Sequence, residues 1–110
     1  MAWVESKAQN DAKSCKIRRK WKQNMSVRVL FVSRRNICRS PMAEFVMKDL
    51  VKKAGLVLQF RIESAATSRE EIGNPVYPPA RRKLSEHGIS CDGHAARQLT
   101  NADYEKYDLL

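Results

Sequence analysis

The segment SRRNICRS, residues 33–40, combines reactive side chains with the start of a helix. Arg39 lies directly before Ser40 and Pro41, a pair typical of a helix start, where unpaired N–H groups and the helix dipole favour an anion. The guanidinium of Arg39 can hold two phosphate oxygens with its fork of donors. A nucleophile at the end of the preceding strand would face such an anion, and Ser33 stands there, six residues before the arginine. The segment therefore predicts a phosphate-binding loop.

The flanking residues predict the elements that would position this loop. An apolar, β-branched run over residues 27–32 is typical of a central strand in a parallel sheet. Apolar residues at helical spacing predict a helix over residues 41–54, with Glu44 in its first turn. The pattern further predicts a second strand over residues 59–65 and a short helix over residues 80–87. A third helix, begun by a capping box at Thr100 and Asp103, is predicted over residues 101–107, and another strand begins at residues 108–110. Because strands alternate with helices, the fold class is α/β with a parallel sheet.

The composition limits the chain to one small globular domain. Its 110 residues are 43% hydrophobic and 30% charged, which is too apolar for a disordered chain, and no apolar run approaches the roughly 18 residues of a membrane span. Three scattered cysteines, Cys15, Cys38 and Cys91, are too few for a disulfide framework. They indicate a reducing compartment, so we expect a cytoplasmic location without membrane attachment.

The excess of basic residues is concentrated at the N-terminus. Lys and Arg exceed Asp and Glu by nine over the chain, and residues 1–24 contribute five of this excess, from seven bases and two acids. This segment has neither helical periodicity nor the apolar core of a secretory signal. We therefore expect residues 1–24 to be a disordered basic leader and residues 25–110 to be the folded domain. Nucleic-acid binding by the leader is the less favoured alternative.

The loop and its surroundings resemble the low-molecular-weight protein-tyrosine phosphatases, in particular the bacterial members. The family signature reads V-C-L-G-N-I-C-R-S-P-M-A-E, and residues 32–44 read V-S-R-R-N-I-C-R-S-P-M-A-E. The resemblance continues through DLVKKAGL, ESAATS, NPVYPPARRKL, EHGIS, GHAARQLT and YEKYDL, so it covers residues 27–110. It implies a three-layer α/β/α fold with a parallel sheet. It also implies hydrolysis of phosphotyrosine esters through a cysteinyl-phosphate, with no metal or organic cofactor, and a phosphotyrosine protein or inorganic phosphate as the partner.

The resemblance implies a role for each residue of the loop. Ser33 stands at the nucleophile position, and Arg39 would bind the phosphate oxygens and stabilise the transition state. Asn36 would hold the loop through hydrogen bonds, and Ser40 would hydrogen-bond the nucleophile. Backbone N–H groups of the loop would surround the phosphate, and the phosphate-binding residues would be Arg34, Arg35, Asn36, Ile37, Cys38, Arg39 and Ser40.

Three further residues have supporting roles in the same resemblance. Ser64 and His94 would brace Asn36 and the loop, and the alternative for both is an ordinary hydrogen-bonded polar residue near the end of the sheet. Cys38 matches the family's second loop cysteine, which can protect the first by a disulfide.

Two substitutions in the loop depart from the family signature. Ser33 replaces the nucleophilic cysteine, and a serine hydroxyl in the same field stays protonated where a cysteine would be a thiolate. We therefore expect phosphate binding without turnover. Arg34 and Arg35 replace Leu-Gly, and a non-glycine residue in a strained conformation costs about 1–3 kcal/mol. We expect a distorted loop with weaker anion binding, although the two guanidinium groups also attract anions.

The length of the chain is a third departure, because family members continue well beyond 110 residues. The resemblance therefore predicts that the C-terminal third is missing, together with the Asp-Pro loop that supplies the general acid. None of Asp92, Asp103 and Asp108 stands before a proline. The sheet would then keep an open apolar edge beside residues 27–32. We expect a truncated and catalytically inactive domain that self-associates through that edge.

Other kinds of protein are alternatives to an inactive phosphatase. A non-catalytic phosphate- or phosphoprotein-binding module would use the arginines of the loop. An arsenate reductase on a related fold would need the loop cysteine and further resolving cysteines, and neither is evident. His87, Cys91 and His94 have side chains that bind zinc, but they lack a fourth ligand, so no metal site is predicted.

Overall fold

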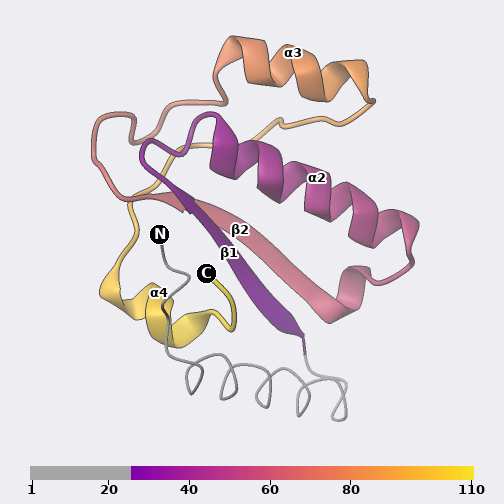
Figure 1. Ribbon diagram of the computed structural model, residues 1–110, viewed down its shortest axis with the longest axis horizontal. Coiled ribbons are helices and arrows are strands. Elements are labelled where there is room, and N and C mark those ends of the chain that lie inside the picture. Colours follow the sequence, from indigo (N-terminus) through magenta and orange to yellow (C-terminus); the bar gives the residue numbers. More distant parts are fainter. Residues whose placement is uncertain (1–25) are drawn as a thin grey trace, which may run out of the picture.

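The computed structural model describes residues 26–110, which fold around a two-stranded parallel sheet (Figure 1). Strand β1 (Val27–Ser33) and strand β2 (Phe60–Ala66) pair in register along their whole length. Helix α2 (Arg39–Lys53) connects them and is followed by the 3₁₀ turn η2 (Val57–Gln59). Both predicted strands are confirmed to within one residue at their ends.

The sheet lies between two layers because successive side chains of a strand point to opposite faces. On one face, Val29 packs in a core cluster with Val51 of α2. On the other face, Leu30 packs with Tyr107, which directly follows helix α4 (Asn101–Lys106). Figure 1 shows the two helices on opposite sides of the sheet. The α/β class and the three-layer arrangement expected from the sequence are therefore confirmed.

Helix α2 begins earlier than the sequence pattern predicts. Its first residue is Arg39, and Cys38 occupies the N-cap position without a side-chain hydrogen bond. Pro41 fits inside the first turn because the N–H that proline lacks has no partner there. Ser40 is therefore not the N-cap residue, and its hydroxyl bonds within the loop instead. The helix ends where it was predicted to end, before Gly55, whose φ of 72° suits glycine.

The early start moves Glu44 out of the first turn, so its predicted role beside the helix dipole is wrong. Glu44 is buried, with 6% of its surface exposed. Its carboxylate accepts hydrogen bonds from Ser64 Oγ and from Lys48 Nζ, each at 2.5 Å. The buried charge is thus paired, as a buried carboxylate must be, and it joins the middle of α2 to β2.

Helix α3 (Pro78–Glu86) covers the N-terminal half of α2 (Figure 1). It begins two residues before the predicted start, at a Pro-Pro pair that fits a first helical turn. Ala80 and Leu84 lie one turn apart and are buried, and Met42 and Phe45 of α2 pack against their cluster. This packing holds the start of α2, and with it the end of the loop that follows β1.

Helix α4 begins with the capping box that the sequence predicts. The Thr100 N–H donates to Asp103 Oδ2 at 2.8 Å, and the Thr100 side chain binds the backbone of the first turn in return. The guanidinium of Arg97 binds both carboxylate oxygens of Asp103, at 3.0 and 3.2 Å. Burial raises the pKa of Asp103, but the hydrogen bonds from Arg97 and Thr100 outweigh burial and hold that pKa below its ordinary value. These contacts fix the segment before α4.

The last residues of the chain begin a further parallel pairing beside β1, as the sequence predicts. Leu109 forms a bridge with Val29, and the Leu30 N–H donates to the Leu109 carbonyl at 2.8 Å. β1 therefore has β2 along one side and a single pairing position near its beginning on the other. Among residues 26–110, no helix has the length and apolar character needed to cross a membrane.

Candidate functional site

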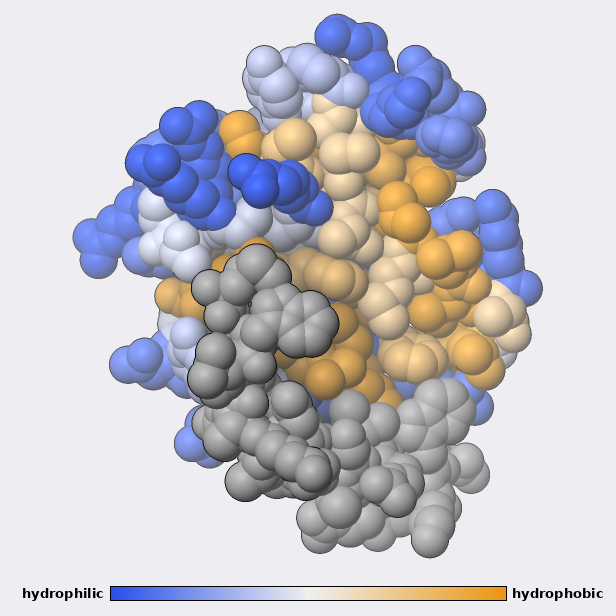
Figure 2. Space-filling model, viewed as in Figure 1, coloured by the Kyte–Doolittle hydropathy of each residue, from blue (hydrophilic) through white to orange (hydrophobic). Residues whose placement is uncertain are grey.

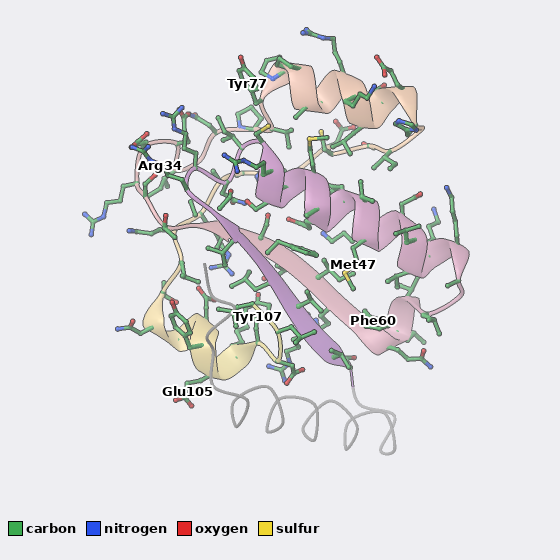
Figure 3. All side chains as sticks on the ribbon, viewed as in Figure 1. Arg34, Met47, Phe60, Tyr77, Glu105 and Tyr107 are labelled. Atoms are coloured by element: carbon green, nitrogen blue, oxygen red, sulfur yellow. The ribbon has the colours of Figure 1, made fainter. Side chains whose placement is uncertain are left out.

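The loop between β1 and α2 forms the wall of a cavity of about 800 Å³ at the carboxyl end of the sheet. Loops at the carboxyl ends of parallel strands are where α/β folds bind ligands. The cavity is lined by the loop and its neighbours, namely Val32, Ser33, Arg34, Arg35, Asn36, Ile37, Cys38, Arg39 and Tyr77. Figure 3 labels Arg34 and Tyr77, which lie at this end of the molecule. The loop residues predicted from the sequence therefore share one concave surface, except Ser40, which is buried behind it.

Asn36 holds the centre of the loop in place. It is fully buried, and its φ of 58° lies in the left-handed region that asparagine tolerates better than most residues. Its side-chain Nδ2 donates to Ser40 Oγ at 2.8 Å, and its Oδ1 accepts from the Arg97 N–H at 3.2 Å. Its carbonyl oxygen accepts from His94 Nε2 at 2.8 Å. Asn36 thus connects the loop to the helix start on one side and to residues 94–97 on the other.

Ser33 ends β1, and its hydroxyl lies within the same network. Ser33 Oγ is 2.6 Å from Oγ of the buried Ser40, and it accepts a longer bond of 3.3 Å from the Asn36 N–H. Because Ser40 Oγ already accepts from Asn36, its own proton can be donated to Ser33. In the described part of the chain, no carboxylate or imidazole hydrogen-bonds to Ser33 Oγ. Among residues 26–110, the direct hydrogen-bond partners of this hydroxyl are therefore another hydroxyl and a backbone N–H.

In the backbone of the loop, several carbonyl groups are hydrogen-bonded, whereas most N–H groups have no partner among the described residues. The carbonyls of Arg34 and Ile37 accept from the N–H groups of Ser68 and Tyr77, at 3.0 and 2.7 Å. By contrast, several loop N–H groups donate to no other residue among those described, and they belong to Arg34, Arg35, Ile37, Cys38, Arg39 and Ser40. A series of unpaired N–H groups at a helix start is suited to an anion such as phosphate.

The three arginines of the loop differ in their partners. Arg34 and Arg35 both form ion pairs with Glu70, each at 3.1 Å. Arg39 lines the cavity, and its guanidinium forms no hydrogen bond or ion pair with any residue from 26 to 110. The guanidinium at the helix start is therefore the one that remains available to bind an oxyanion in the cavity.

Ser64 and His94, which the sequence places beside the loop, have different positions. Ser64 Oγ donates to Glu44 Oε1, so it joins β2 to α2 and makes no hydrogen bond to Asn36. The ionised carboxylate is the stronger acceptor, which explains this choice. His94 contacts Asn36 and also packs edge-on against Phe45, with ring centroids 6.0 Å apart. His94 therefore connects the loop to the apolar side of α2.

Three contributors to the site are absent from the sequence-based prediction. Glu70 binds both exposed loop arginines, Tyr77 forms a wall of the cavity, and the Arg97 N–H binds Asn36. Each of them lies more than 30 residues from its partner in the chain. The local spacing of residues could not have indicated these contacts. The one available signal is Tyr77, because an aromatic residue next to prolines is typical of an exposed loop.

Two cysteines of the described region, Cys38 and Cys91, are free thiols. Cys38 packs against the cluster that contains Cys91 and the buried residues of α3. In the region from residue 26 onward, no group of three or more His, Cys, Asp or Glu side chains is arranged to hold a metal ion.

Comparison with known protein families and sequences gives consistent matches. The family model for low molecular weight phosphotyrosine protein phosphatase matches residues 28–110. The low molecular weight protein-tyrosine-phosphatase YfkJ of Bacillus subtilis is 42% identical over 84 residues, which make up 76% of this chain and 54% of that protein. The low molecular weight phosphotyrosine protein phosphatase of Gallus gallus is 45% identical over 82 residues, or 74% and 51% of the two chains. The chain thus spans about half the length of the curated relatives that it matches.

Solved structures give the same result. The crystal structure of Bacillus subtilis YfkJ superposes with a TM-score of 0.75 at 41% identity, and the alignment covers 76% of this chain and 54% of that one. A protein tyrosine phosphatase from Entamoeba histolytica, crystallised with HEPES in the active site, gives a TM-score of 0.73 at 30% identity with the same coverage. With its fold, its loop and residues 28–110 all matching, the chain belongs to the low-molecular-weight phosphotyrosine protein phosphatase family.

Proposed function

We propose that this chain binds phosphotyrosine-type phosphomonoesters in the cavity at the carboxyl end of β1 and does not hydrolyse them. The observation that carries the proposal is the loop itself, in which Ser33 lines one cavity with backbone N–H groups and an Arg39 guanidinium that have no partner among residues 26–110. The donors suit a phosphate dianion, and the attacking group of the family reaction is replaced by a hydroxyl. Neither a metal ion nor an organic cofactor is part of this function.

In this proposal each loop residue has a defined task. Arg39 binds two phosphate oxygens, and the loop N–H groups bind the others. Asn36 keeps the N–H groups converging by holding the left-handed turn, and His94 supports it through its carbonyl oxygen. Ser40 orients the hydroxyl of Ser33. Ser64 acts at a greater distance, by fixing β2 against α2 through Glu44.

The lack of turnover follows from the chemistry of Ser33. A thiolate at this position would attack phosphorus directly, but an alcohol needs a base to remove its proton. Ser33 Oγ has two hydrogen-bond partners, the hydroxyl of Ser40 and the N–H of Asn36. Neither of these groups is a base that could remove its proton.

An aromatic residue in the wall of the cavity supports an aryl phosphate as the ligand. Tyr77 lines the cavity, half of its surface is exposed, and its N–H is fixed to the Ile37 carbonyl at 2.7 Å. Its backbone is therefore fixed beside the loop, and its exposed ring is available to contact the ring of a phosphotyrosine. The HEPES in the active site of the Entamoeba relative carries a sulfonate, an oxyanion with tetrahedral geometry like that of phosphate.

Binding is tested by calorimetric titration of the chain with phosphotyrosine and with inorganic phosphate. We expect both to bind, and we expect Arg39→Ala to weaken both by about tenfold or more, because hydrogen bonds to charged groups contribute roughly 1.5–3 kcal/mol. Arg81→Ala is the matched control, since it removes an equal charge from an exposed ion pair with Asp92 in another part of the molecule. Equal losses in the two variants would refute a specific role of Arg39.

Turnover is tested with p-nitrophenyl phosphate. The natural chain should release no nitrophenolate, whereas Ser33→Cys should release it as the thiolate attacks phosphorus and the bond to the phenolic oxygen breaks. The phosphoryl group then remains on sulfur, and intact-protein mass spectrometry detects it. Hydrolysis by the natural chain that disappears in Arg39→Ala would show that the proposed inactivity is wrong.

The open edge of β1 supports a second partner, namely another copy of this chain. Beyond Leu30, β1 pairs with β2 only, among the residues that the structure describes. Exposed strand edges are templates for strand addition.

A location in the cytoplasm also stays a prediction, consistent with the free thiols of Cys38 and Cys91.

A further inference from the structure

Arg34 and Arg35 share one carboxylate at the rim of the cavity. Arg34 Nη2 lies 3.1 Å from one oxygen of Glu70, and Arg35 Nε lies 3.1 Å from the other. All three side chains are exposed, by 73%, 52% and 44%. Two guanidinium groups thus face a single carboxylate, and one positive charge is left without compensation beside a cavity that also contains Arg39.

The backbone holds this group of charges in place. The Thr67 N–H donates to the Ser33 carbonyl at 2.9 Å, and the Ser68 N–H donates to the Arg34 carbonyl at 3.0 Å. Glu70 follows two residues after this pair of bonds, so it is carried on a segment that is fixed to the loop. The backbone that carries Arg34, Arg35 and Glu70 is therefore fixed beside the phosphate-binding N–H groups of the same loop.

The surface around the rim is strongly polar. Figure 2 shows hydrophilic side chains gathered at the upper left, at the end of the molecule where Figure 3 labels Arg34. Arg69, beside Glu70, binds Gln98 through its Nε at 3.2 Å, so its charge has no carboxylate partner in the described part of the chain. An approaching anion therefore meets a net positive rim before it reaches the cavity.

We propose that Arg34 and Arg35 form a second anion subsite, which selects phosphotyrosine ligands that carry an acidic residue next to the phosphotyrosine. This inference rests on the proposed function, because Arg39 and the loop N–H groups must hold the phosphate. Glu70 is the internal competitor of the ligand carboxylate. Exposed ion pairs contribute little to stability, so an incoming carboxylate can replace Glu70 at small cost.

The shape of the subsite determines which anion it accepts. A guanidinium presents two parallel donors that match the two oxygens of a carboxylate, and Arg34 and Arg35 each line the same cavity as Arg39. The second anion must therefore lie close to the phosphate, within the nearest residues of the same peptide. A simple phosphate ion is too small to occupy both subsites at once.

The test compares two fluorescent phosphotyrosine peptides that differ only in their flanking residues, glutamates in one and glutamines in the other. We expect fluorescence anisotropy to show tighter binding of the glutamate peptide, by about threefold to tenfold. The double variant Arg34→Ala/Arg35→Ala should lose this preference and bind the two peptides equally. Glu70→Gln should strengthen binding of the glutamate peptide only, because the competitor loses its charge.

Arg81→Ala is the control, because Arg81 is 59% exposed and paired with Asp92 at 3.2 Å. If it reduces the preference as much as the double variant does, net charge explains the effect and the subsite is refuted. If inorganic phosphate binds but the two peptides bind equally, the subsite alone is refuted. If the natural chain binds neither phosphate nor peptide, the proposed function fails, and the subsite fails with it.

Discussion

Asn36 has a left-handed backbone conformation, and its side-chain amide forms two hydrogen bonds, with Ser40 and with the Arg97 N–H. We expect Asn36→Ala to lower the free energy of unfolding by about 2–4 kcal/mol. The change removes the bonds to Ser40 and to the Arg97 N–H and puts an alanine at positive φ, which costs roughly 1–2 kcal/mol. Urea unfolding followed by circular dichroism measures the loss.

Asn36→Gly separates the two causes, because glycine adopts positive φ freely but makes no side-chain hydrogen bond. It should recover roughly 1 kcal/mol relative to Asn36→Ala. Both variants should bind phosphate more weakly than the natural chain, since the loop N–H groups lose their fixed geometry. Equal stability of the alanine and glycine variants would mean that the backbone conformation of Asn36 carries no strain.

Tyr107 gives a prediction at alkaline pH. Burial and the hydrogen bond that its hydroxyl donates to Glu63 raise the pKa of Tyr107 to about 12, against the smaller opposing effect of Arg97. The neutral phenol is favoured in the folded state, so its contribution is complete below the ordinary pKa near 10 and is lost as the pH rises through 12. We expect the free energy of unfolding to fall by on the order of 2 kcal/mol over this range.

Tyr107→Phe removes the titrating group and should remove this alkaline loss. Chemical unfolding at a series of pH values between 9 and about 12 provides the measurement. Tyr104→Phe is the matched control, because Tyr104 is 63% exposed and lies on helix α4, which Tyr107 directly follows. An unchanged alkaline loss in Tyr107→Phe would mean that another group is responsible.

At the scale of the elements, periodicity predicted the strands and helices well because each has a strong local signal. The apolar run of β1, the Pro-started α3 and the capping box of α4 are all short-range patterns. The start of α2 was predicted two residues late, because Ser40-Pro41 fits an N-cap pair as well as it fits a first turn. Tertiary bonds of Ser40 to Ser33 and Asn36 decided between the two.

The candidate site could be predicted only in part, for the same reason. The loop residues are adjacent in the sequence, so their shared cavity follows from one motif. Glu70 is distant from Arg34 in the chain, and Glu44 is distant from Ser64, so these pairs appear only when β2 and the following segment are placed against β1 and α2. Long-range electrostatic partners are not encoded in local spacing.

The capping box of α4 gives a prediction for an element. The pKa of Asp103 lies below its ordinary value near 4, so its charged form stabilises the folded state above that pH, and this contribution is lost as the pH falls through the folded value. We expect Asp103→Asn to lower stability by about 1–3 kcal/mol at pH 7 and by progressively less below about pH 4. Thermal or urea unfolding at both pH values measures the difference.

Asp49→Asn serves as the control for Asp103→Asn. Asp49 pairs with Lys53 at 2.8 Å within one helix, and such surface pairs contribute only about 0.3–0.5 kcal/mol. It should therefore cost much less than Asp103→Asn at pH 7. If the two substitutions cost the same, the pairing of Asp103 with Arg97 and Thr100 does not stabilise α4.

At the scale of the whole molecule, the distribution of charge separates phosphate binding by the loop from nucleic-acid binding by residues 1–24. Residues 1–24 carry five of the nine excess positive charges, and the folded part carries four. We expect deletion of residues 1–24 to leave the binding of inorganic phosphate unchanged, because Arg39 and the loop are retained. Binding of nucleic acid, where it occurs, should disappear with the deletion and fall steeply with salt. Phosphate binding that is lost with the leader would contradict this division.

The open edge of β1 leads to a prediction about the state of association. In a parallel strand the N–H and C=O of one residue point to the same side, and every second residue repeats that direction. The backbone N–H and C=O of Val32 therefore point to the same edge of β1 as the Leu30 N–H, which binds Leu109. From residue 26 to residue 110, no segment pairs with Val32 on that side. We expect the average mass of the chain in sedimentation to rise with its concentration. Val32→Pro should reduce this rise, because proline removes a donor from the edge, whereas Val32→Ala should not. A chain that stays monomeric at high concentration, or a proline variant that associates as strongly as the alanine variant, would exclude the edge as the contact.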